Sequence, residues 1–316
     1  MMKSKPVGWL LVLFVALSVR PVPLYAATWV RATSNLAIMA AAYRSTDGAQ
    51  SPSPPAAPTN LRVLVGAPTG TTIFFDDFLG TSVDSANWTV YDRLSDQANG
   101  EINCVIPQNV SVRDGLLSGV SKFEDRVCGD SVEPPKTMHY TSWQIAQATA
   151  PFRYGTIEVR AKIPGGTGLW PCIWMLGFKW QASQPFTANT PEHNWPHDGW
   201  SEVDIAEFMG NSRTTVNNQV HFESANVGPG FKNLPFDATT RFMVYRLQWQ
   251  AGSMIWSVDA EDGKGYQTLS SLSGSGVPNV PMYVIIHTAI GGVFGGTPNP
   301  STFPQTFQVD WVRITQ

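Results

Sequence analysis

The sequence predicts an all-β fold, a sandwich or jelly roll, on three observations. The 316 residues include 27 Gly and 24 Pro, which favour frequent turns over long helices. From Thr71 onward, short apolar runs are separated by Gly, Pro, Asn and Asp, and several alternate with polar residues. Few windows show helical periodicity with proper caps. The expected strands include residues 157–163, 173–176, 203–208, 242–249, 254–258, 282–287 and 307–314.

Composition excludes some classes of protein. With 43% hydrophobic residues the chain can bury a substantial core, so general disorder is excluded. With a net charge of −3, the chain lacks the excess of Lys and Arg that is typical of nucleic-acid-binding proteins. The 12 tryptophans suit either an all-β core or flat platforms for a ligand.

The N-terminus has the pattern of a secretory signal peptide, residues 1–27. Lys3 and Lys5 precede an apolar run of 13 residues, Val7–Val19, which is too short to span a bilayer. Small residues, Ala26 and Ala27, follow. We therefore expect a secreted protein with no membrane contact in its mature form, although an uncleaved N-terminal anchor is the alternative.

Two segments follow the signal peptide. Residues 28–60 contain the Pro-rich stretch 51–58 and are expected to form an extended spacer. Residues 61–316 carry the strand pattern and are expected to form a single catalytic domain, which we expect to be a monomer.

Three cysteines are present in this chain. Cys104 and Cys128 lie in polar, turn-rich sequence, whereas Cys172 lies in an apolar run. In an exported protein a pair is expected to be bridged, so we predict a Cys104–Cys128 disulfide with Cys172 free and buried. The alternative is three free thiols. No Cys/His cluster has the spacing of a zinc site.

The most informative segment is Trp200–Phe208, which contains three carboxylates. Side chains alternate along a strand, so Glu202 and Asp204 point the same way and Glu207 points the other way. One β-bulge near residues 205–206 would return Glu207 to the face of the other two acids. The alternative interpretations, which involve no catalysis, are an exposed acidic edge or a calcium site built from carboxylates.

A row of three acids on one face is repulsive unless one of them stays protonated. Glycoside hydrolysis needs that combination, because one carboxylate attacks the sugar while one carboxylic acid protonates the leaving oxygen. Asp204, between the two glutamates, would hold their pKa values apart.

An ordered series of motifs from Phe74 to Ile314 resembles glycoside hydrolase family 16, the β-glucanase family that includes laminarinases. The motifs are Phe74-Phe-Asp-Asp-Phe78, Asn99-Gly-Glu101, Asn109-Val-Ser-Val-Arg-Asp-Gly115, Tyr140-Thr-Ser142, the run 154–164, Gly168-Leu-Trp-Pro171, the acid segment and the run 303–313. The resemblance implies a curved, concanavalin A-like two-sheet jelly roll with a glycan cleft on its concave face.

The resemblance also implies roles for the acids. Glu202 looks like the nucleophile, Glu207 like the general acid/base and Asp204 like the assisting acid. The two-residue gap before Glu207 is the bulged form of the motif, which is similar to laminarinases, agarases and carrageenases.

Further positions match substrate-binding positions of the family. Trp200 faces the same way as Glu202 and is expected to stack on sugar, with core packing as the alternative. Glu158 and Arg160 share a strand face and are expected to contact sugar, with an ion pair as the alternative. The remaining candidates are Trp170, His221 and Asn99, and for Trp170 and His221 a structural role is equally open.

No cofactor is expected for catalysis. The resemblance implies a structural calcium ion, with Asp310 as a candidate ligand or, alternatively, a hydrogen-bond partner.

The sequence therefore predicts a secreted, retaining endo-glycosidase whose partner is a polysaccharide, foremost β-1,3-glucan. The rivals are a galactanase acting on agarose or carrageenan, a non-catalytic glycan-binding jelly roll, and a calcium-dependent structural β-domain.

Overall fold

The computed structural model describes residues 70–129, 134–177, 201–222 and 225–316, which fall within one compact unit of the chain. The predicted all-β class is confirmed, because the described elements are strands β1 to β18, the short helix α1 (Gly292–Gly295) and two 3-10 turns, η1 (Pro107–Asn109) and η3 (Pro300–Thr302). None of the described helices is long and apolar enough to cross a membrane.

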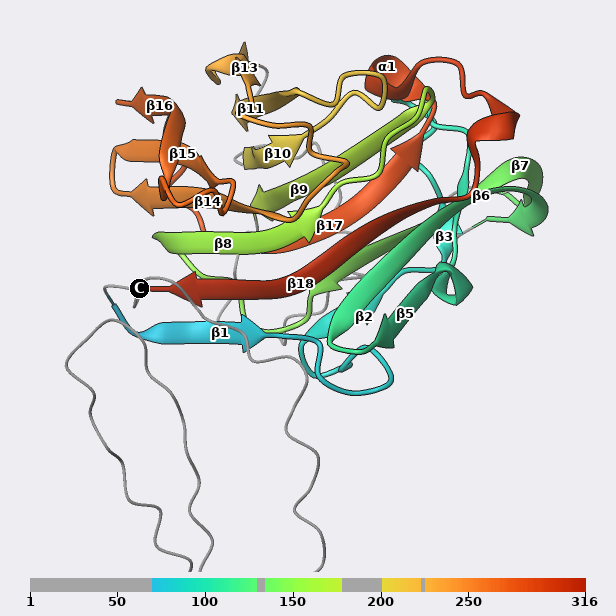
Figure 1. Ribbon diagram of the computed structural model, residues 1–316, viewed down its shortest axis with the longest axis horizontal. Helices are drawn as coiled ribbons and strands as arrows, with labels where there is room; N and C mark the ends of the chain where they lie inside the picture. The colour runs from blue at the N-terminus through green and yellow to red at the C-terminus, as the bar shows by residue number, and fades with distance from the viewer. Residues whose placement is uncertain (1–69, 130–133, 178–200, 223–224) are drawn as a thin grey trace, which may run out of the picture. The chain divides into compact units, whose positions relative to one another are not determined.

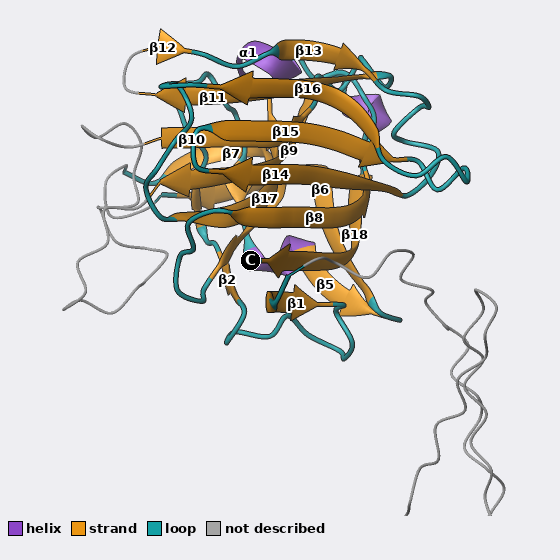
Figure 2. Cartoon of the chain, turned by 90° about the vertical axis from the view of Figure 1, so that its left-hand side faces the viewer, coloured by secondary structure: helices purple, strands orange, loops and turns teal. Residues whose placement is uncertain are grey.

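The strands form two facing sheets, the first of which we call sheet A. Its members are β1 (Thr72–Asp76), β5 (Val110–Arg113), β6 (Leu116–Cys128), β8 (Gly155–Lys162), β14 (Met243–Gln250), β15 (Ser253–Asp259), β16 (Gln267–Ser273) and β18 (Gln305–Thr315). The order β18–β8–β14–β15–β16 is antiparallel throughout, and β18 pairs on its other side with β6 and then β1. Figure 2 shows this sheet face on, from β16 at the top to β1.

The second sheet, sheet B, lies behind sheet A in Figure 2. Its members are β2 (Trp88–Val90), β7 (Lys136–Gln147), β9 (Leu169–Gly177), β10 (Ser201–Glu207), β11 (Thr215–Phe222), β12 (Ala225–Asn226), β13 (Gly230–Asn233) and β17 (Met282–Ile290). The strand order is β2–β7–β17–β9–β10–β11, and β12 and β13 both pair with β11. Two short strands complete this part of the fold: β4 (Cys104–Val105) pairs with the middle of β7, and β3 (Arg93–Leu94) pairs with β4.

The long strands β6 and β7 join the two sheets at one end (Figure 1). The first half of β6 pairs with β18 in sheet A, and its second half pairs with the start of β7. A disulfide between Cys104 and Cys128 ties β4 to the end of β6, and Cys172 is free and buried, as the sequence analysis expects. This corner therefore carries a covalent link between strands distant in sequence.

The core lies between the sheets and follows from strand alternation. Ile173, Val203 and Ile286 of sheet B point into it and are fully buried. Each such side chain contributes about 1.5–3 kcal/mol through burial. Trp143 also fills this space, and it can do so because the neighbouring β6 position is Gly119, where a Cβ would lie 1.9 Å from the indole.

Strand β10 carries the predicted bulge. Asp204 pairs with Gln219, but Glu207 pairs with Asn217, so three steps along β10 face two steps along β11. The bulge interrupts the two-residue alternation, and Glu202, Asp204 and Glu207 consequently share the face of sheet B that points away from the core. The sequence prediction of a row of three acids is confirmed.

Sheet A holds this bulge in place from below. The side-chain amide N–H of Asn218 donates to the Ile205 backbone carbonyl at 2.8 Å, and the Ser270 hydroxyl on β16 donates to the side-chain oxygen Oδ1 of Asn218 at 2.9 Å. The Trp256 indole N–H on β15 donates to the Asp204 carbonyl at 2.9 Å. Because an irregular strand leaves backbone groups without ladder partners, these side chains replace the missing hydrogen bonds.

We predict that Asn218→Ala destabilises the fold by about 1–3 kcal/mol, because it removes the side-chain hydrogen bond to the buried Ile205 carbonyl. Ser270→Ala should act in the same direction and more weakly. Thermal and denaturant unfolding measure both changes. The matched control is Ser271→Ala on the same strand, where the side chain is exposed and little change is expected. Equal effects of Ser270→Ala and Ser271→Ala would show that the Ser270 hydrogen bond to Asn218 does not support the bulge.

Candidate functional site

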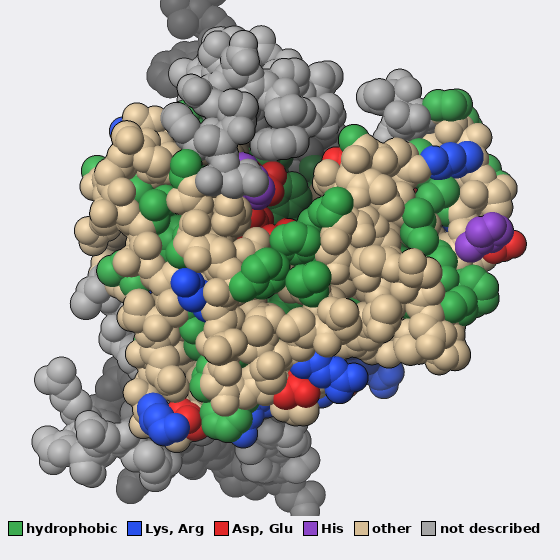
Figure 3. All heavy atoms as spheres, turned by 90° about the horizontal axis from the view of Figure 1, so that it is seen from above, with side chains coloured by type: hydrophobic (Ala, Val, Ile, Leu, Met, Phe, Trp, Pro, Cys, Tyr) green, Lys and Arg blue, Asp and Glu red, His purple; other side chains and the backbone are tan. Residues whose placement is uncertain are grey.

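A cleft of about 510 Å³ lies on the face of sheet B that points away from sheet A. Its floor comes from β9, β10, β11 and β17, and its walls come from the segment 93–103 on one side and from α1 and β13 on the other. Figure 3 looks into this hollow and shows acidic and histidine side chains at its base, with hydrophobic side chains beside them.

Cross-strand pairing arranges the floor in rows. Glu207 lies between Cys172 and Asn217 on the neighbouring strands, and these side chains line the cleft. The next two rows along β10 are Trp174–Asp204–Gln219 and Leu176–Glu202–His221. The backbone positions of Glu202 and Glu207 are thus four steps apart on β11, about 13 Å, and the carboxyl groups extend into one cleft.

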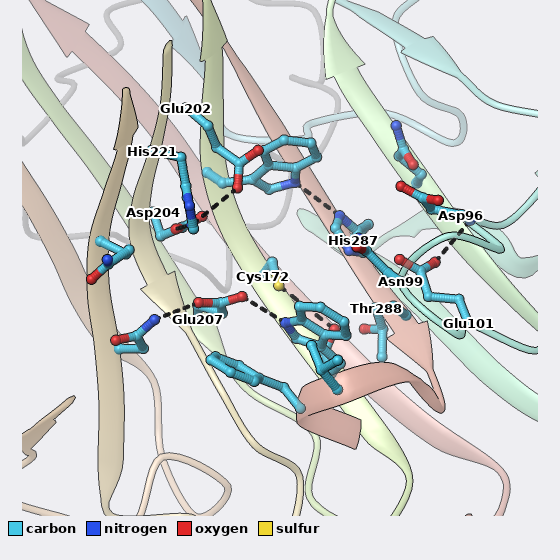
Figure 4. A pocket seen from close by; sticks show the side chains of 18 of the residues that line it. Asp96, Asn99, Glu101, Cys172, Glu202, Asp204, Glu207, His221, His287 and Thr288 are labelled. Atoms are coloured by element: carbon cyan, nitrogen blue, oxygen red, sulfur yellow. Dashed lines mark hydrogen bonds and ion pairs between the residues drawn. The ribbon is translucent and has the colours of Figure 1, made fainter. Parts of the chain in front are cut away.

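Glu207 is the most constrained acid of the row. One carboxyl oxygen accepts the Trp170 indole N–H at 2.8 Å, and the other accepts the Asn217 amide at 2.7 Å (Figure 4). Burial raises the pKa of Glu207 to about 8; the charge of Asp204 adds to the rise, and the two hydrogen bonds oppose it. Glu207 therefore retains a proton near neutral pH in an orientation set by two fixed donors.

The other two acids share a histidine. His221 Nε2 lies 3.4 Å from Asp204 Oδ2 and 3.7 Å from Glu202 Oε1. Burial raises the pKa of Glu202 and the charge of Asp204 adds to the rise, while the imidazole opposes it. Burial also raises the pKa of Asp204, again opposed by His221. The Glu202 side chain is 19% exposed against 3% for Asp204, so Glu202 is the one more open to the cleft.

Asp96, Asn99 and Glu101 line the wall opposite the acid row (Figure 4). The Glu101 carboxylate accepts the Asp96 backbone N–H at 3.2 Å. Burial raises the pKa of Glu101 to about 7 against the opposing charge of Arg93. The predicted residue Asn99 is thus in the cleft, while Glu101 is a residue that the sequence analysis missed, although it stands in the same quoted motif.

Aromatic side chains line the wall beside Glu207. Trp170 is only 9% exposed, and its ring lies 5.2 Å from that of Phe294 on α1. Phe294 in turn lies 5.6 Å from Phe231 on β13, which is 49% exposed. Trp170 therefore lines the cleft, as expected, and also holds the Glu207 carboxyl.

Glu158 and Arg160 lie away from the cleft. They stand on β8 of sheet A, on the face opposite the core residues Ile157 and Val159. Glu158 accepts two N–H groups of Arg313, at 2.8 and 2.7 Å. Both residues form ion pairs, although with other partners than each other: Glu158 with Arg313, and Arg160 with Asp310 and Glu261. Their strand belongs to sheet A, whereas the cleft lies on sheet B.

Asp310 provides the second partner of Arg160, which also pairs with Glu261. Arg160 Nη1 donates to Asp310 Oδ2 at 2.8 Å, and Asp310 is buried. A guanidinium at this carboxylate does not fit a calcium ligand, because it would oppose a second cation there. The hydrogen-bond alternative describes Asp310 here, and a structural calcium stays a prediction.

Among the described residues, Glu202, Asp204 and His221 also have potential ligand atoms within 4.8 Å of one another. The acid–base pairing given above accounts for this cluster without a metal ion. Trp200, the signal peptide 1–27 and the spacer 28–60 lie outside the described residues, so those expectations stay predictions.

Comparisons with known proteins agree with this geometry. The chain is 28% identical over 283 residues to glucan endo-1,3-beta-glucosidase A1 of Niallia circulans, which covers 80% of this chain and 39% of that protein. It is 28% identical over 261 residues to the glucan endo-1,3-beta-glucosidase of Cryptopygus antarcticus, which covers 75% and 89%. A LamA variant of Z. galactanivorans, solved in complex with laminaritriose and laminaritetraose, superposes with a TM-score of 0.66 at 28% identity over 78% of this chain and 99% of that chain.

The model of glycosyl hydrolases family 16 matches residues 130–313, which include the acid row and most of both sheets. The resemblance read from the sequence motifs is therefore confirmed. The chain belongs to glycosyl hydrolases family 16.

Proposed function

We propose that this protein is a retaining endo-glycosidase that hydrolyses β-1,3-glucan. The observation that carries the proposal is the acid row itself, in which Glu207 holds a proton beside the more exposed Glu202 on the floor of one cleft. Retaining glycoside hydrolysis uses two carboxyl groups in one cleft, one as the acid/base and one as the nucleophile. The choice of glucan rests on the relatives, two of which are named glucan endo-1,3-beta-glucosidases.

The reaction begins with Glu202 attacking the anomeric carbon. As its carboxylate oxygen bonds to that carbon, the glycosidic bond breaks, and Glu207 gives its proton to the departing oxygen. His221 favours the ionised form of Glu202 that this attack needs. The product of this step is a glycosyl ester on Glu202.

The second step regenerates the enzyme. Glu207, now a carboxylate, takes a proton from water as the water oxygen bonds to the anomeric carbon, and the ester bond to Glu202 breaks. A sugar hydroxyl in place of water would give transglycosylation. Asn217 and Trp170 stabilise the Glu207 carboxylate between the two steps, because both donate hydrogen bonds to it.

A panel of polysaccharides tests the proposed substrate. We expect reducing ends to be released from laminarin, and no release by a Glu202→Gln protein prepared in parallel. The same assay uses lichenan, agarose, carrageenan and xyloglucan. Release from agarose or carrageenan alone would replace the proposal by a galactanase, and binding of laminarin by the wild-type protein without product would replace it by a glycan-binding module.

Azide rescue tests the separate roles of the two glutamates. Glu202→Ala and Glu207→Ala should each lower kcat by about 10²–10⁴-fold or more. On an aryl laminaribioside, azide should enter either vacated space and form a glycosyl azide. The product should have inverted configuration with Glu202→Ala, because azide replaces the nucleophile. It should have retained configuration with Glu207→Ala, because azide attacks the glycosyl ester from the opposite face.

The matched control for azide rescue is Glu261→Ala, since Glu261 pairs with Arg160 on sheet A and lies outside the cleft. It should keep activity and give no glycosyl azide. Azide products of exchanged configuration would reverse the two assignments.

The raised pKa of Glu207 predicts an alkaline limit to activity. The general acid must be protonated, so kcat/KM should fall as the pH rises through about 8. Asn217→Ala should move this limb to higher pH, because the lost hydrogen bond favours the carboxylate. Asp204→Asn should move it to lower pH in the residual activity, because the lost negative charge opposes ionisation.

The same shift affects the stability of the fold. The unfolded chain releases this proton near the ordinary value of 4.5, so stability due to Glu207 declines as the pH rises from there to about 8. Glu207→Gln should therefore raise the melting temperature more at pH 8 than at pH 5.

For activity, the alkaline limb of kcat/KM should move in opposite directions in Asn217→Ala and Asp204→Asn. A limb that moves in the same direction in both variants would show that Glu207 does not set it.

A further inference from the structure

His287 lies on the cleft floor and has no role in the mechanism above. On β17 the preceding residue, Ile286, points into the core, so His287 points into the cleft. Its neighbours across the sheet are Gln144 on β7 and Cys172 on β9. Cys172 is itself opposite Glu207, which places His287 two strands, about 10 Å, from the acid row.

Trp174 determines which nitrogen of His287 carries a proton. The Trp174 indole Nε1 lies 2.8 Å from His287 Nδ1, and the two rings are nearly perpendicular. An indole N–H can only donate, so Nδ1 must accept and carry a lone pair. The proton of a neutral imidazole then lies on Nε2. The Trp174 contact thereby makes His287 Nε2 a hydrogen-bond donor.

The surroundings keep His287 neutral. Burial lowers its pKa to about 3, and the positive charge of Arg93 contributes in the same direction. Arg93 is held nearby, because its Nη2 donates to Gln144 on the strand next to His287 at 2.8 Å. A protonated ring would also set an N–H of Nδ1 against the Trp174 N–H.

Figure 4 shows His287 between the acid row and the wall formed by Asn99 and Glu101. Within the residues that the structure describes, no hydrogen bond or ion pair is made by its Nε2. A fixed donor at this place suits a ligand rich in hydroxyl acceptors, which is the chemistry of a glycan.

We propose that His287 is a glycan-binding residue whose Nε2–H donates to a hydroxyl oxygen of a sugar next to the one being cleaved, and that Trp174 is the positioning residue that fixes its tautomer. The proposal rests on the proposed function, since it assigns a contact to the same cleft. It names a determinant of affinity outside the acid row.

The test measures binding of laminarihexaose to the catalytically silent Glu202→Gln parent by calorimetry. His287→Met removes the donor at similar volume and should weaken binding about tenfold, the effect of one lost hydrogen bond. His287→Gln keeps an N–H donor and should recover most of the affinity. Melting temperatures accompany each titration, and a purely structural His287 would lower them without this split between Met and Gln.

Two further measurements test the part played by Trp174. The ¹⁵N shifts of the His287 ring should show a proton on Nε2 and none on Nδ1 at neutral pH. Trp174→Phe should weaken binding in the presence of His287 and weaken it less in the His287→Met background. Equal losses in both backgrounds, or a proton on Nδ1, would overturn the positioning role.

The outcomes separate this inference from the proposed function. If the Glu202→Gln parent binds laminarihexaose and His287→Met binds it equally well, the inference is wrong and the proposed function stands. If the parent binds no laminarihexaose, both are wrong.

Discussion

The bulge in β10 is the constraint on which the cleft depends. Without it, the two-residue alternation of a strand would turn Glu207 toward the core, where a carboxyl group would lack solvent and partners. With it, three acids face one cleft while Val203 and Ile205 stay buried. The bulge is supported from sheet A, because Asn218 is held by Ser270 and Trp256 bonds the Asp204 carbonyl. The two sheets therefore cooperate in one catalytic geometry.

Crowded acids set the electrostatics of the cleft. Burial raises the pKa of all three carboxyls of the row, and the charge of Asp204 adds to the rise at Glu202 and Glu207. The opposite wall adds Glu101, whose pKa is also raised. His221 supplies the nearby opposing group for Glu202 and Asp204. Across the floor His287 is neutral. Burial thus disfavours charge on the acids and on His287 in the cleft, which is consistent with the proposed uncharged polysaccharide.

The tryptophans differ in the groups to which their indole N–H donates a hydrogen bond. Trp249 and Trp256 are fully buried core residues, yet the Trp256 N–H fixes the backbone of the acid row. Trp170 and Trp174 line the cleft, and their N–H groups orient Glu207 and His287. An indole provides a large apolar body and one donor at a fixed place, so it can pack and position a neighbour at once.

The sequence by itself predicted the all-β class, because alternation is a local property of a strand. The bulge and the shared face of the three acids were a hypothesis that the family resemblance supported, because alternation alone turns Glu207 to the other face. The sequence also placed Glu158 and Arg160 on one face of a strand, but it left open which sheet that strand joins. The strand belongs to sheet A, where the two residues form ion pairs. Only the tertiary structure showed the places of His287 and Glu101 in the cleft and the hydrogen bonds by which Asn218 supports the bulge. Which strands become neighbours, and therefore which side chains meet, depends on contacts between residues far apart in the chain, such as Trp174 with His287 and Asn218 with Ser270.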